Sequence, residues 1–384
     1  METFKVKLNR VLLAYHFFPH YRKGVLEELA NEIPIDFLAD SSGIDGIKAY
    51  QFNDKNRFID AKCHYFRGLM FQRKIVSLAT FGDYDAYIFL ANPNHITTWL
   101  ASVVCKLRGK RVIFWGHGFL SSKKTPKNQL RRYFFSLANS FYTYGYRAKQ
   151  NAMSLGFPEH SLHVGFNSLD YEHQINFRKD LPPPEQSKTL RIACVSRLTK
   201  LCRYDMLLEA CALAYMQCGL QIEVDFIGDG PERQSLTEQA ISLGIKSRFH
   251  GAVYDESAIS KLFSAADVTV MPGKIGLTAM HSMMYGTPVI SHDDFERQMP
   301  EVEAIVPGVT GNLFRYGDVH HLSETLIQSK AQFSDRENVR KNCFRMIDEI
   351  YNPKRQVDVM LRALNGEAAE NGDDTLNIFK GYKK

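Results

Sequence analysis

Short hydrophobic runs alternate with longer amphipathic segments along most of the 384-residue chain. In the first half, runs rich in β-branched and aromatic residues predict strands, and the segments between them carry apolar residues at helical spacing. Such alternation is typical of a parallel sheet covered by helices on both faces. The expected strands cover residues 10–15, 35–40, 86–91, 111–116 and 140–145, with helices such as 24–32 and 97–109 between them.

The segment LPPPEQSK, residues 181–188, interrupts this pattern, and its three prolines followed by polar residues predict a stiff linker. A second strand–helix series begins directly after it. The expected strands of this series cover residues 190–196, 221–230, 247–251, 268–273 and 287–292, and its helices cover residues 204–219, 231–244, 257–266 and 276–286.

The two series predict an N-terminal domain over residues 1–180 and a C-terminal domain over residues 188–350, hinged at the linker. Residues 351–384 are expected to form a C-terminal helix and a polar tail, either loosely held or crossing back to the N-terminal domain. Ligands of such sheets bind beyond the carboxyl ends of the strands, so we expect two of these edges to face each other across a cleft.

The composition is that of an ordinary globular protein, with 45% hydrophobic and 23% charged residues. No apolar run reaches the roughly 18 residues of a membrane-spanning helix, and the first ten residues lack the apolar core of a signal peptide. A cytoplasmic protein is expected, with peripheral contact at the inner face of the plasma membrane as an open alternative. Seven cysteines without a C-x-x-C pair argue against a disulfide framework or a zinc site.

The net charge of +6 is unevenly distributed. Residues 1–180 hold 25 basic and 15 acidic side chains, whereas residues 181–384 hold 23 and 27. The basic first half suits an anionic substrate or an anionic membrane, or serves only as solubilising surface. The aromatic and basic stretch 129–147 is a candidate for membrane contact, with burial in the core as the alternative. Nucleic acid is not an expected partner, since no helix-turn-helix, zinc-finger or RNP-like pattern is present.

Cations follow the first strand of the second domain. Arg197, Lys200 and Arg203 fall in the turn or just inside the next helix, where a cationic cluster suits a pyrophosphate, with solvated surface charge as the alternative. The next strand ends in FIGDGPER, residues 226–233, a strand–helix turn of a type common in α/β proteins. The candidate binding residues of that turn are Gly228, Asp229 and Gly230.

The stretch PGKIGLTAMHSMMYGTPVI, residues 272–290, has the outline of a phosphate-binding corner. Two glycines precede a helix expected to begin near Leu277, and the N–H groups of a helix start attract phosphate. No G-K-[ST] follows, so the spacing is not that of a Walker A loop. A structural role for the histidine of this helix is the alternative to ligand binding. The candidate donor-binding residues here are Lys274, Gly276, Leu277, Thr278 and His281.

In the first domain, WGHGF places His117 directly after a strand, between two glycines that permit the close approach of a ligand. A histidine there can donate a hydrogen bond or exchange a proton near neutral pH, and a buried capping role is the alternative. The loop HFFPHYRKG after the first strand mixes aromatic and basic residues at the same edge. Its candidates for contact with an acceptor are His16, His20, Tyr21 and Arg22.

Taken together, these segments resemble the family-4 retaining glycosyltransferases of GT-B fold, most clearly over residues 190–320. SRLTKLCRYDMLLEA is similar to the family's G-R-L-x-x-x-K-G-x-D-L-L-x-E-A segment, and GDGPE, RFHGAV and GTPVI followed by MPEVEAIVPGVTGNLF resemble its further motifs in the same order. In the first half, WGHG resembles the family's H-G turn and GFNSLD resembles its N-G-x-D turn. The resemblance implies an α/β protein of two Rossmann-like doubly wound domains facing across a cleft.

This sequence departs from the family pattern in two places. The family usually has two glutamates, with seven residues between them, that contact the donor sugar and the ribose, and these positions fall here at Gly273 and His281. His281 can still hydrogen-bond a ribose hydroxyl, whereas the sugar would need another partner such as Lys274. Cys202 stands where the family has a phosphate-binding lysine, with Arg203 or Lys200 as candidate replacements. A similar P-G-x-x-G-L-x-x-x-H corner occurs among polysaccharide-assembly transferases.

The resemblance implies a retaining glycosyltransferase that moves a sugar from a nucleotide-diphosphate donor to a glycan or lipid-pyrophosphate-linked glycan, in the assembly of a cell-surface polysaccharide such as lipopolysaccharide or capsule. Arg197 and His117 would act in catalysis, and Glu301 and Asp293 would line the sugar pocket. Neither a cofactor nor a metal is expected, because cations and a helix start can stabilise the leaving diphosphate. Two alternatives stay open: a nucleotide-sugar 2-epimerase of the same fold, and a non-catalytic binding module that has lost the glutamates.

Overall fold

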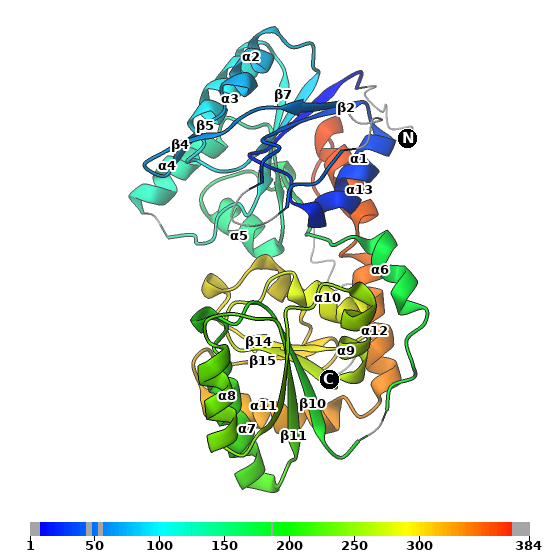
Figure 1. Cartoon of the computed structure of the whole chain (residues 1–384). Helices are drawn as coiled ribbons and strands as arrows, with labels where there is room; N and C mark the ends of the chain where they lie inside the picture. Colours follow the sequence, from blue (N-terminus) through cyan, green and yellow to red (C-terminus); the bar gives the residue numbers. More distant parts are fainter. Residues whose placement is uncertain (1–7, 44–47, 53–56, 124, 186, 371–384) are drawn as a thin grey trace. The chain divides into compact units, whose positions relative to one another are not determined.

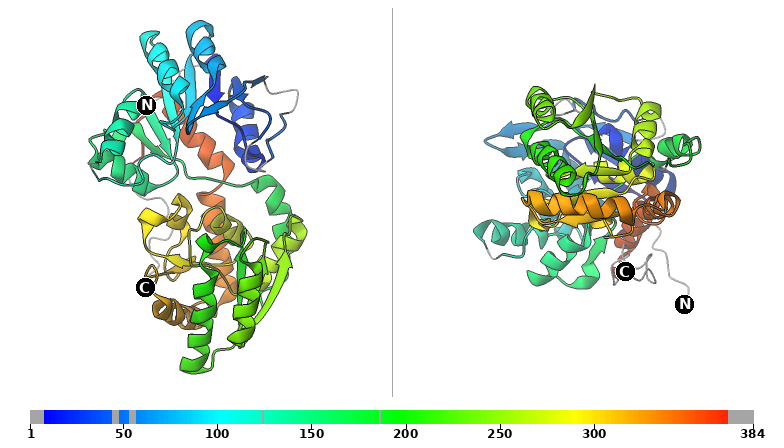
Figure 2. Two further views of the ribbon diagram at one scale, coloured as in Figure 1. Left: turned by 60° about the vertical axis from the view of Figure 1, so that its left-hand side comes forward. Right: turned by 90° about the horizontal axis from the view of Figure 1, so that it is seen from below.

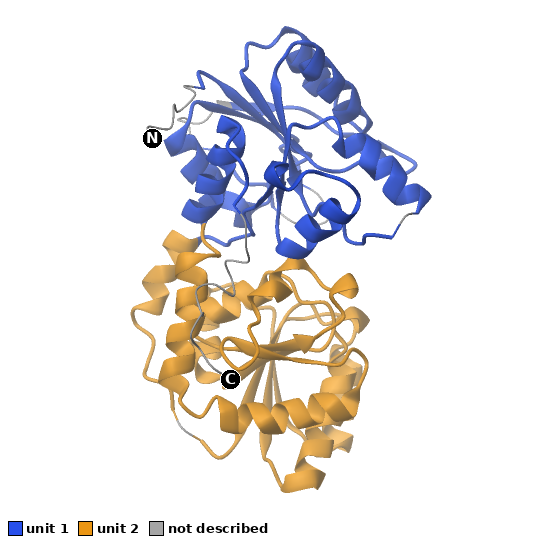
Figure 3. Ribbon diagram, turned by 180° about the vertical axis from the view of Figure 1, so that it is seen from behind, with its two compact units in different colours: residues 1–170, 353–372 blue, residues 171–352, 373–384 orange. Residues whose placement is uncertain are grey.

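The chain forms two compact units in the computed structural model (Figures 1 and 3). Unit 1 comprises residues 1–170 and 353–372, and unit 2 comprises residues 171–352 and 373–384. The segment 181–188, expected as the linker between domains, belongs to unit 2, where Arg340 donates a hydrogen bond to the carbonyl of Pro182 (2.7 Å). The structure describes residues 8–43, 48–52, 57–123, 125–185 and 187–370.

A seven-stranded parallel sheet with the order β3-β2-β1-β6-β7-β8-β9 forms the centre of unit 1. Most of these strands are buried on both faces, which explains why they read as continuous hydrophobic runs. The strands are β1 (Val11–Ala14), β2 (Ile35–Ala39), β3 (Arg57–Asp60), β6 (Ala86–Leu90), β7 (Arg111–Gly116), β8 (Ser140–Thr143) and β9 (Leu162–Val164), and a separate antiparallel hairpin joins β4 (His64–Phe66) and β5 (Leu69–Phe71).

Helices cover both faces of this sheet because successive side chains of a strand point to opposite sides. Leu13 and Trp115 belong to the apolar layer that contains α1 (Lys23–Glu32) and α13 (Pro353–Asn365). Leu12 and Phe114 belong to the opposite layer. The helices of that opposite layer are α2 (Arg73–Phe81), α3 (Ile96–Leu107), α4 (Pro126–Phe135) and α5 (Tyr146–Ser154).

The C-terminal helix α13, red in Figures 1 and 2, packs beside α1 although it follows unit 2 in the sequence. Gln356 of α13 anchors it to the segment after β9, with its side-chain amide donating to the carbonyl of Phe166 (2.9 Å) and its side-chain oxygen accepting from Ser168 (2.5 Å). Residues 353–370 therefore complete the core of unit 1.

A six-stranded parallel sheet with the order β12-β11-β10-β13-β14-β15 forms the centre of unit 2. Its strands are β10 (Leu190–Val195), β11 (Ile222–Ile227), β12 (Lys246–Gly251), β13 (Val268–Met271), β14 (Val289–His292) and β15 (Gly311–Phe314). Helix α7 packs with α8 and α11, whereas α10 packs with α6 and α12. The helices are α6 (Tyr171–Arg178), α7 (Tyr204–Cys218), α8 (Arg233–Ser242), α9 (Glu256–Ala265), α10 (Thr278–Met284), α11 (Val319–Gln332) and α12 (Arg336–Glu349), and short 3₁₀ turns cover His20–Arg22, Glu159–Ser161, Lys200–Cys202, Phe295–Arg297 and Pro300–Ala304.

The stretch 129–147 contributes several of its aromatic residues to the core of unit 1. It contains the end of α4, all of β8 and the start of α5, and its residues Phe134, Phe135, Phe141 and Tyr142 are buried against the sheet. Leu130 and Tyr133 are its exposed large hydrophobic residues. Among the described residues, no helix has both the length and the apolar character needed to cross a membrane.

Candidate functional site

The loops that follow β10 and β13 flank the point in unit 2 where the strand order reverses. The chain builds outward from β10 towards β11 and β12, and then from the other side of β10 towards β13, β14 and β15. In such sheets the loops at the reversal diverge and leave a crevice for ligands beyond the carboxyl ends of the strands. The two segments expected to bind phosphate, residues 196–203 and 272–278, follow these two strands.

Two glycines of the turn after β11 support the loop after β10. A Cβ atom on Gly228 would lie 1.9 Å from the carbonyl oxygen of Ser196, and one on Gly230 would lie 2.2 Å from that of Leu198. The backbone N–H of Leu198 also donates to the carbonyl of Asp229 (3.0 Å). Gly228 and Gly230 therefore permit two backbones to approach more closely than any side chain would allow.

Cys202 and Gly273 join the two loops at the strand reversal. The buried Sγ of Cys202 lies 3.3 Å from both the carbonyl oxygen of Arg197 and Oγ of Ser196, so the thiol closes the loop on itself. The N–H of Gly273 donates to the carbonyl of Cys202 (2.9 Å), and a Cβ atom on Gly273 would lie 1.8 Å from the carbonyl oxygen of Leu201. The loop after β10 thus occupies the space that a side chain at residue 273 would need.

Gln298 braces the loop after β13. Its side-chain oxygen accepts from the N–H of Ile275 (2.8 Å), and its amide donates to Ser291 Oγ (2.8 Å). Thr278 ties the start of α10 to β10 by donating to the carbonyl of Val195 (3.1 Å). The N–H groups of residues 276 and 277 have no acceptor among the described residues, so they remain able to bind a ligand at the start of α10.

Three exposed cations stand on these two loops. Arg197 and Lys200 follow β10, and Lys274 follows β13. None of the three side chains makes a hydrogen bond or an ion pair with any described residue. Their charges are therefore available to a polyanion, and guanidinium and ammonium groups are the usual protein partners of phosphate.

Lys200 and Arg203 also border a cavity of about 410 Å³ between the starts of α7 and α8. Arg203 adopts a left-handed backbone conformation (φ 55°) and its Nε lies 3.4 Å from Asp205 Oδ1. The cavity is lined by the cations Lys200 and Arg203 and by the acids Asp205 and Glu232, so it does not present a uniformly positive surface. Its lining residues are Thr199, Lys200, Arg203, Tyr204, Asp205, Glu232, Ser235, Leu236 and Gln239.

His281 is directed towards α9. Its Nε2 atom lies 2.6 Å from Oε1 of Glu256, and the same carboxylate accepts from the hydroxyl of Tyr285 and from the amide of Gln174 (3.1 Å). Burial would raise the pKa of Glu256, but these donors, His281 first, outweigh it and hold the pKa below its ordinary value. Because a carboxylate only accepts, Nε2 must donate, which leaves Nδ1 as the ring nitrogen able to meet a ligand.

The remaining candidates of unit 2 have structural partners. Asp229 accepts from the N–H of Gly230 (2.8 Å) and pairs with Arg233 (3.2 Å), so it braces its own turn. Glu301 is 2% exposed on the 3₁₀ turn Pro300–Ala304. Asp293 accepts from the N–H of Tyr316 (3.1 Å) at the end of β14.

The candidates of unit 1 lie at the carboxyl edge of its own sheet. His117 follows β7, is exposed, and has its ring 4.9 Å from that of Tyr144, which follows β8. In the loop after β1, His20 is exposed and its ring lies 5.7 Å from that of Tyr21. Arg22 is only 9% exposed, so it does not lie open on the surface as His20 does.

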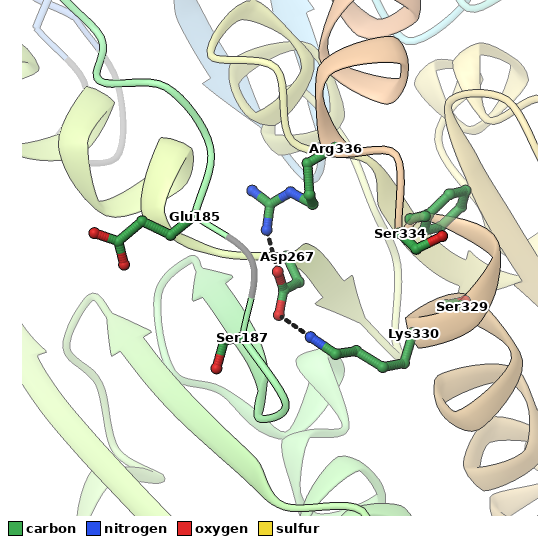
Figure 4. Close-up of a pocket in the computed structure, with 8 residues that line it drawn as sticks. Glu185, Ser187, Asp267, Ser329, Lys330, Ser334 and Arg336 are labelled. Carbon is green, nitrogen blue, oxygen red and sulfur yellow. Dashed lines mark hydrogen bonds and ion pairs between the residues drawn. The ribbon is translucent and has the colours of Figure 1, made fainter.

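A second cavity, of about 100 Å³, lies at the opposite end of the unit 2 sheet, where β13 begins (Figure 4). Asp267 lies in its wall and is 5% exposed. Its carboxylate pairs with Arg336 and with Lys330 (3.2 Å) and accepts from the backbone N–H of Arg191 (2.9 Å). The carboxylate is paired with both cations and stands away from the carboxyl ends of the strands, so the cluster is a structural clamp.

Sequence reasoning missed Glu256, Gln298 and the contact at Gly273. Glu256 follows Asp255, which caps α9 through the N–H of Ala258 (2.8 Å), and that position predicts a helix start but no contact with α10. Among the described residues, no group of three or more His, Cys, Asp or Glu side chains is placed to hold a metal ion.

Residues 175–346 match the family Glycosyl transferases group 1. This part of the chain contains all six strands of unit 2 and both loops at the strand reversal. The family match therefore lies within unit 2.

Among characterised relatives, the chain is 27% identical over 163 residues to the GDP-mannose-dependent alpha-(1-6)-phosphatidylinositol dimannoside mannosyltransferase of Mycobacterium tuberculosis. The match covers 40% of this chain and 39% of that protein.

Two solved structures resemble the chain over nearly its whole length. The lipopolysaccharide outer core galactosyltransferase WaaB shares a TM-score of 0.68 at 17% identity, over 92% of this chain and 99% of that one. The Anabaena protein Alr3699/HepE in complex with UDP shares a TM-score of 0.66 at 15% identity, over 93% and 99%. At such identities the likeness establishes the fold, two Rossmann-like parallel sheets as in GT-B glycosyltransferases.

Proposed function

We propose that the protein is a retaining glycosyltransferase that moves a sugar from a nucleotide-diphosphate donor to a hydroxyl of a glycan or lipid-linked glycan in cell-surface polysaccharide assembly. The observation that carries the proposal is the set of unpaired cations Arg197, Lys200 and Lys274 at the strand reversal of unit 2, within the residues that match the group 1 glycosyltransferase family. The relatives support it, since one is described as a mannosyltransferase, one as a galactosyltransferase, and HepE was solved with UDP.

In the proposed reaction, the bond between the anomeric carbon and the diphosphate oxygen breaks and negative charge builds on the leaving diphosphate. Arg197, Lys274 and the N–H groups at the start of α10 are the proposed donors for that charge. Removing one such donor typically costs about 2.7–4 kcal/mol of transition-state stabilisation. His117 is the proposed contribution of unit 1 to catalysis.

The acceptor hydroxyl then forms the new bond on the face that the diphosphate leaves. A phosphate oxygen of the leaving group takes up the hydroxyl proton, so the reaction needs no carboxylate base from the protein. This route is compatible with the absence of glutamates at residues 273 and 281, where the chain has a glycine in a crowded backbone and a histidine paired with Glu256. The proposal includes no metal and no cofactor, and peripheral contact with an anionic membrane remains a prediction.

A donor-hydrolysis assay tests this function without knowledge of the acceptor. Each of UDP-glucose, UDP-galactose, UDP-N-acetylglucosamine and GDP-mannose is incubated with the protein, and the release of nucleoside diphosphate and the anomer of the freed sugar are followed by ¹H NMR. We expect slow release with one donor, and the freed sugar initially in the donor's configuration. Arg197→Ala should lower that rate on the order of 10²–10³-fold. Lys261→Ala, an exposed lysine of α9, is the matched control and should not change the rate.

Two results would contradict the proposal. Conversion of the nucleotide sugar to an epimer without nucleotide release would identify a 2-epimerase. Stabilisation by a nucleotide sugar without any turnover, in the presence or absence of cell-envelope glycans, would identify a non-catalytic binding module, which the displaced glutamate positions favour as the second candidate.

A further inference from the structure

Arg22 of unit 1 is a buried cation in an aromatic cage. Its side chain is 9% exposed, and its guanidinium carbon lies 4.9 Å from the ring centre of Trp115, 5.5 Å from that of Tyr15 and 5.4 Å from that of Tyr144. The face of an aromatic ring attracts a cation, and the attraction grows when water is excluded. The cage therefore fixes the position of the guanidinium.

No carboxylate of the described residues pairs with Arg22. Nη2 donates to the hydroxyl of Tyr144, but Nη1 is buried and has no hydrogen-bond partner among those residues. Burial opposes the charge, yet the neighbouring tyrosine hydroxyls, with Tyr144 first, hold the pKa of Arg22 above its ordinary value. A permanent positive charge thus lies in unit 1 without a counter-charge of its own, which is costly unless a partner compensates it.

The indole N–H of Trp115 is a second hydrogen-bond donor without a partner, in addition to Nη1 of Arg22. The side chain is 1% exposed, and its indole Nε1 is also buried without a partner in the part of the chain that the structure describes. The ring nitrogen Nδ1 of His16 shares this condition. Burial, aided by Arg22, lowers the pKa of His16 to about 4, so His16 adds no second charge at neutral pH.

The chemistry of these atoms defines the missing partner. Guanidinium and indole nitrogens donate hydrogen bonds and cannot accept them, so only a hydrogen-bond acceptor satisfies both. The permanent charge of Arg22 favours an anionic acceptor, and a planar guanidinium suits a carboxylate or phosphate. Arg22 lies in the segment after β1 and Trp115 lies near the carboxyl end of β7, so both are at the carboxyl edge of the sheet, where such sheets bind ligands.

We propose that Arg22 and Trp115 form an oxyanion subsite that binds a phosphate or carboxylate group of the acceptor. Its assignment to the acceptor rests on the proposed transferase function, whereas the subsite itself rests only on the geometry of unit 1. The basic excess of residues 1–180 would guide an anionic acceptor towards this unit.

The two indole N–H resonances of the ¹⁵N-labelled protein report on the subsite directly. The chain contains two tryptophans, and Trp99 already donates its indole N–H to the carbonyl of Pro93 (2.9 Å), so it serves as an internal reference. The Trp99→Phe variant assigns the signals. Inorganic phosphate, glucuronate, UDP and GDP are titrated in parallel.

We expect phosphate or glucuronate to move the Trp115 resonance saturably while that of Trp99 stays in place, and the stronger of the two identifies the kind of anion. Arg22→Met should weaken this binding at least about tenfold, Arg22→Lys should weaken it less, and exposed Arg73→Met is the matched control.

A Trp115 resonance that does not shift with phosphate or glucuronate, or that shifts equally in Arg22→Met, would overturn the subsite. If UDP or GDP moves the Trp115 resonance at lower concentrations than phosphate and glucuronate do, the subsite belongs to the donor, and the assignment to the acceptor is overturned. Loss of donor hydrolysis in Arg197 variants would not affect this titration, so the two proposals can fail separately.

Discussion

Nε2 of His281 on α10 lies 2.6 Å from Oε1 of Glu256, which opens α9. The pair joins two helices at the edge where unit 2 is expected to bind its donor. At residue 281, where the family resemblance implies a carboxylate, the chain has an imidazole that is itself held by a carboxylate from another helix.

We predict that His281→Ala lowers the free energy of unfolding by about 1–3 kcal/mol, because the largely buried carboxylate of Glu256 loses a donor. His281→Gln can still donate to Glu256 and should retain most of that stability. Nucleotide affinity should fall in both variants, since neither retains the imidazole Nδ1. Denaturant unfolding and calorimetric titration measure the two quantities, and full nucleotide affinity in His281→Gln would show that the histidine only braces the helices.

A glutamate placed at residue 273 should destabilise the protein. In Gly273→Glu the new Cβ would meet the carbonyl oxygen of Leu201 at 1.8 Å, and this backbone cannot move without disturbing the turn closed by Cys202. We expect a loss of stability above about 2 kcal/mol and weaker nucleotide binding. Gly276→Ala is the control, because its Cβ would meet only Met299 at an ordinary 3.7 Å. Gly273→Glu with wild-type stability would contradict the described packing.

The strand and helix pattern could be predicted from the sequence because β-branched and aromatic runs dominate the central strands. The predicted segments around β1, β6, β7, β10, β11 and β13 are all found as parallel strands. The edge strands β9 (LHV) and β15 (GNLF) were missed, since three or four residues with a polar residue or glycine carry no clear period. Local patterns also gave no indication of the distant contacts between Gly273 and Leu201 or between Glu256 and His281.

The sequence indicates which charged residues follow the strands of the candidate site, but it does not indicate how the side chains of the site are oriented. Arg197 and Lys274 follow strands that the sequence already indicated, so their place at the strand reversal follows from topology. Cys202 and His281 instead turn towards neighbouring protein atoms, and Arg22 is enclosed by aromatic rings contributed by β7 and by the segments after β1 and β8. Such orientations depend on tertiary packing, which the sequence of a single segment does not predict.

Asp267 should matter for stability and not for catalysis. Asp267→Asn leaves Arg336 buried without its counter-charge and removes the partner of Lys330, so we expect a loss of about 3–5 kcal/mol in denaturant unfolding. Donor hydrolysis at a temperature where the variant is folded should match the wild type. Glu185→Gln, whose pair with Arg191 is exposed, should cost less than about 1 kcal/mol. A folded Asp267→Asn protein without activity would overturn this separation.

Acid should weaken unit 1 through His163. Burial, aided by Lys149, Arg362 and Arg111, lowers its pKa to about 4 in the folded protein, against about 6.5 in the unfolded chain. As the pH falls, the unfolded chain is protonated first, so the stability contributed by neutral His163 is complete above about pH 6.5 and is lost between about pH 6.5 and 4.

His163→Gln should therefore reduce the loss of unfolding free energy across that window by up to about 3 kcal/mol. Urea unfolding at a series of pH values measures it, and exposed His160→Gln is the matched control. An unchanged pH dependence in His163→Gln would assign the acid sensitivity to other groups.

Nucleoside diphosphate binding to the wild type and to the double variant Arg197→Ala/Lys274→Ala tests the central claim most directly. A ligand that binds only the folded protein raises its melting temperature by mass action. We predict that UDP or GDP stabilises the wild type, and that the double variant, equally stable without ligand, loses at least about a hundredfold in affinity because two charge-assisted contacts are gone. If neither nucleotide shifts the melting of the wild type, or if the double variant binds as tightly, the strand reversal of unit 2 is not a donor site.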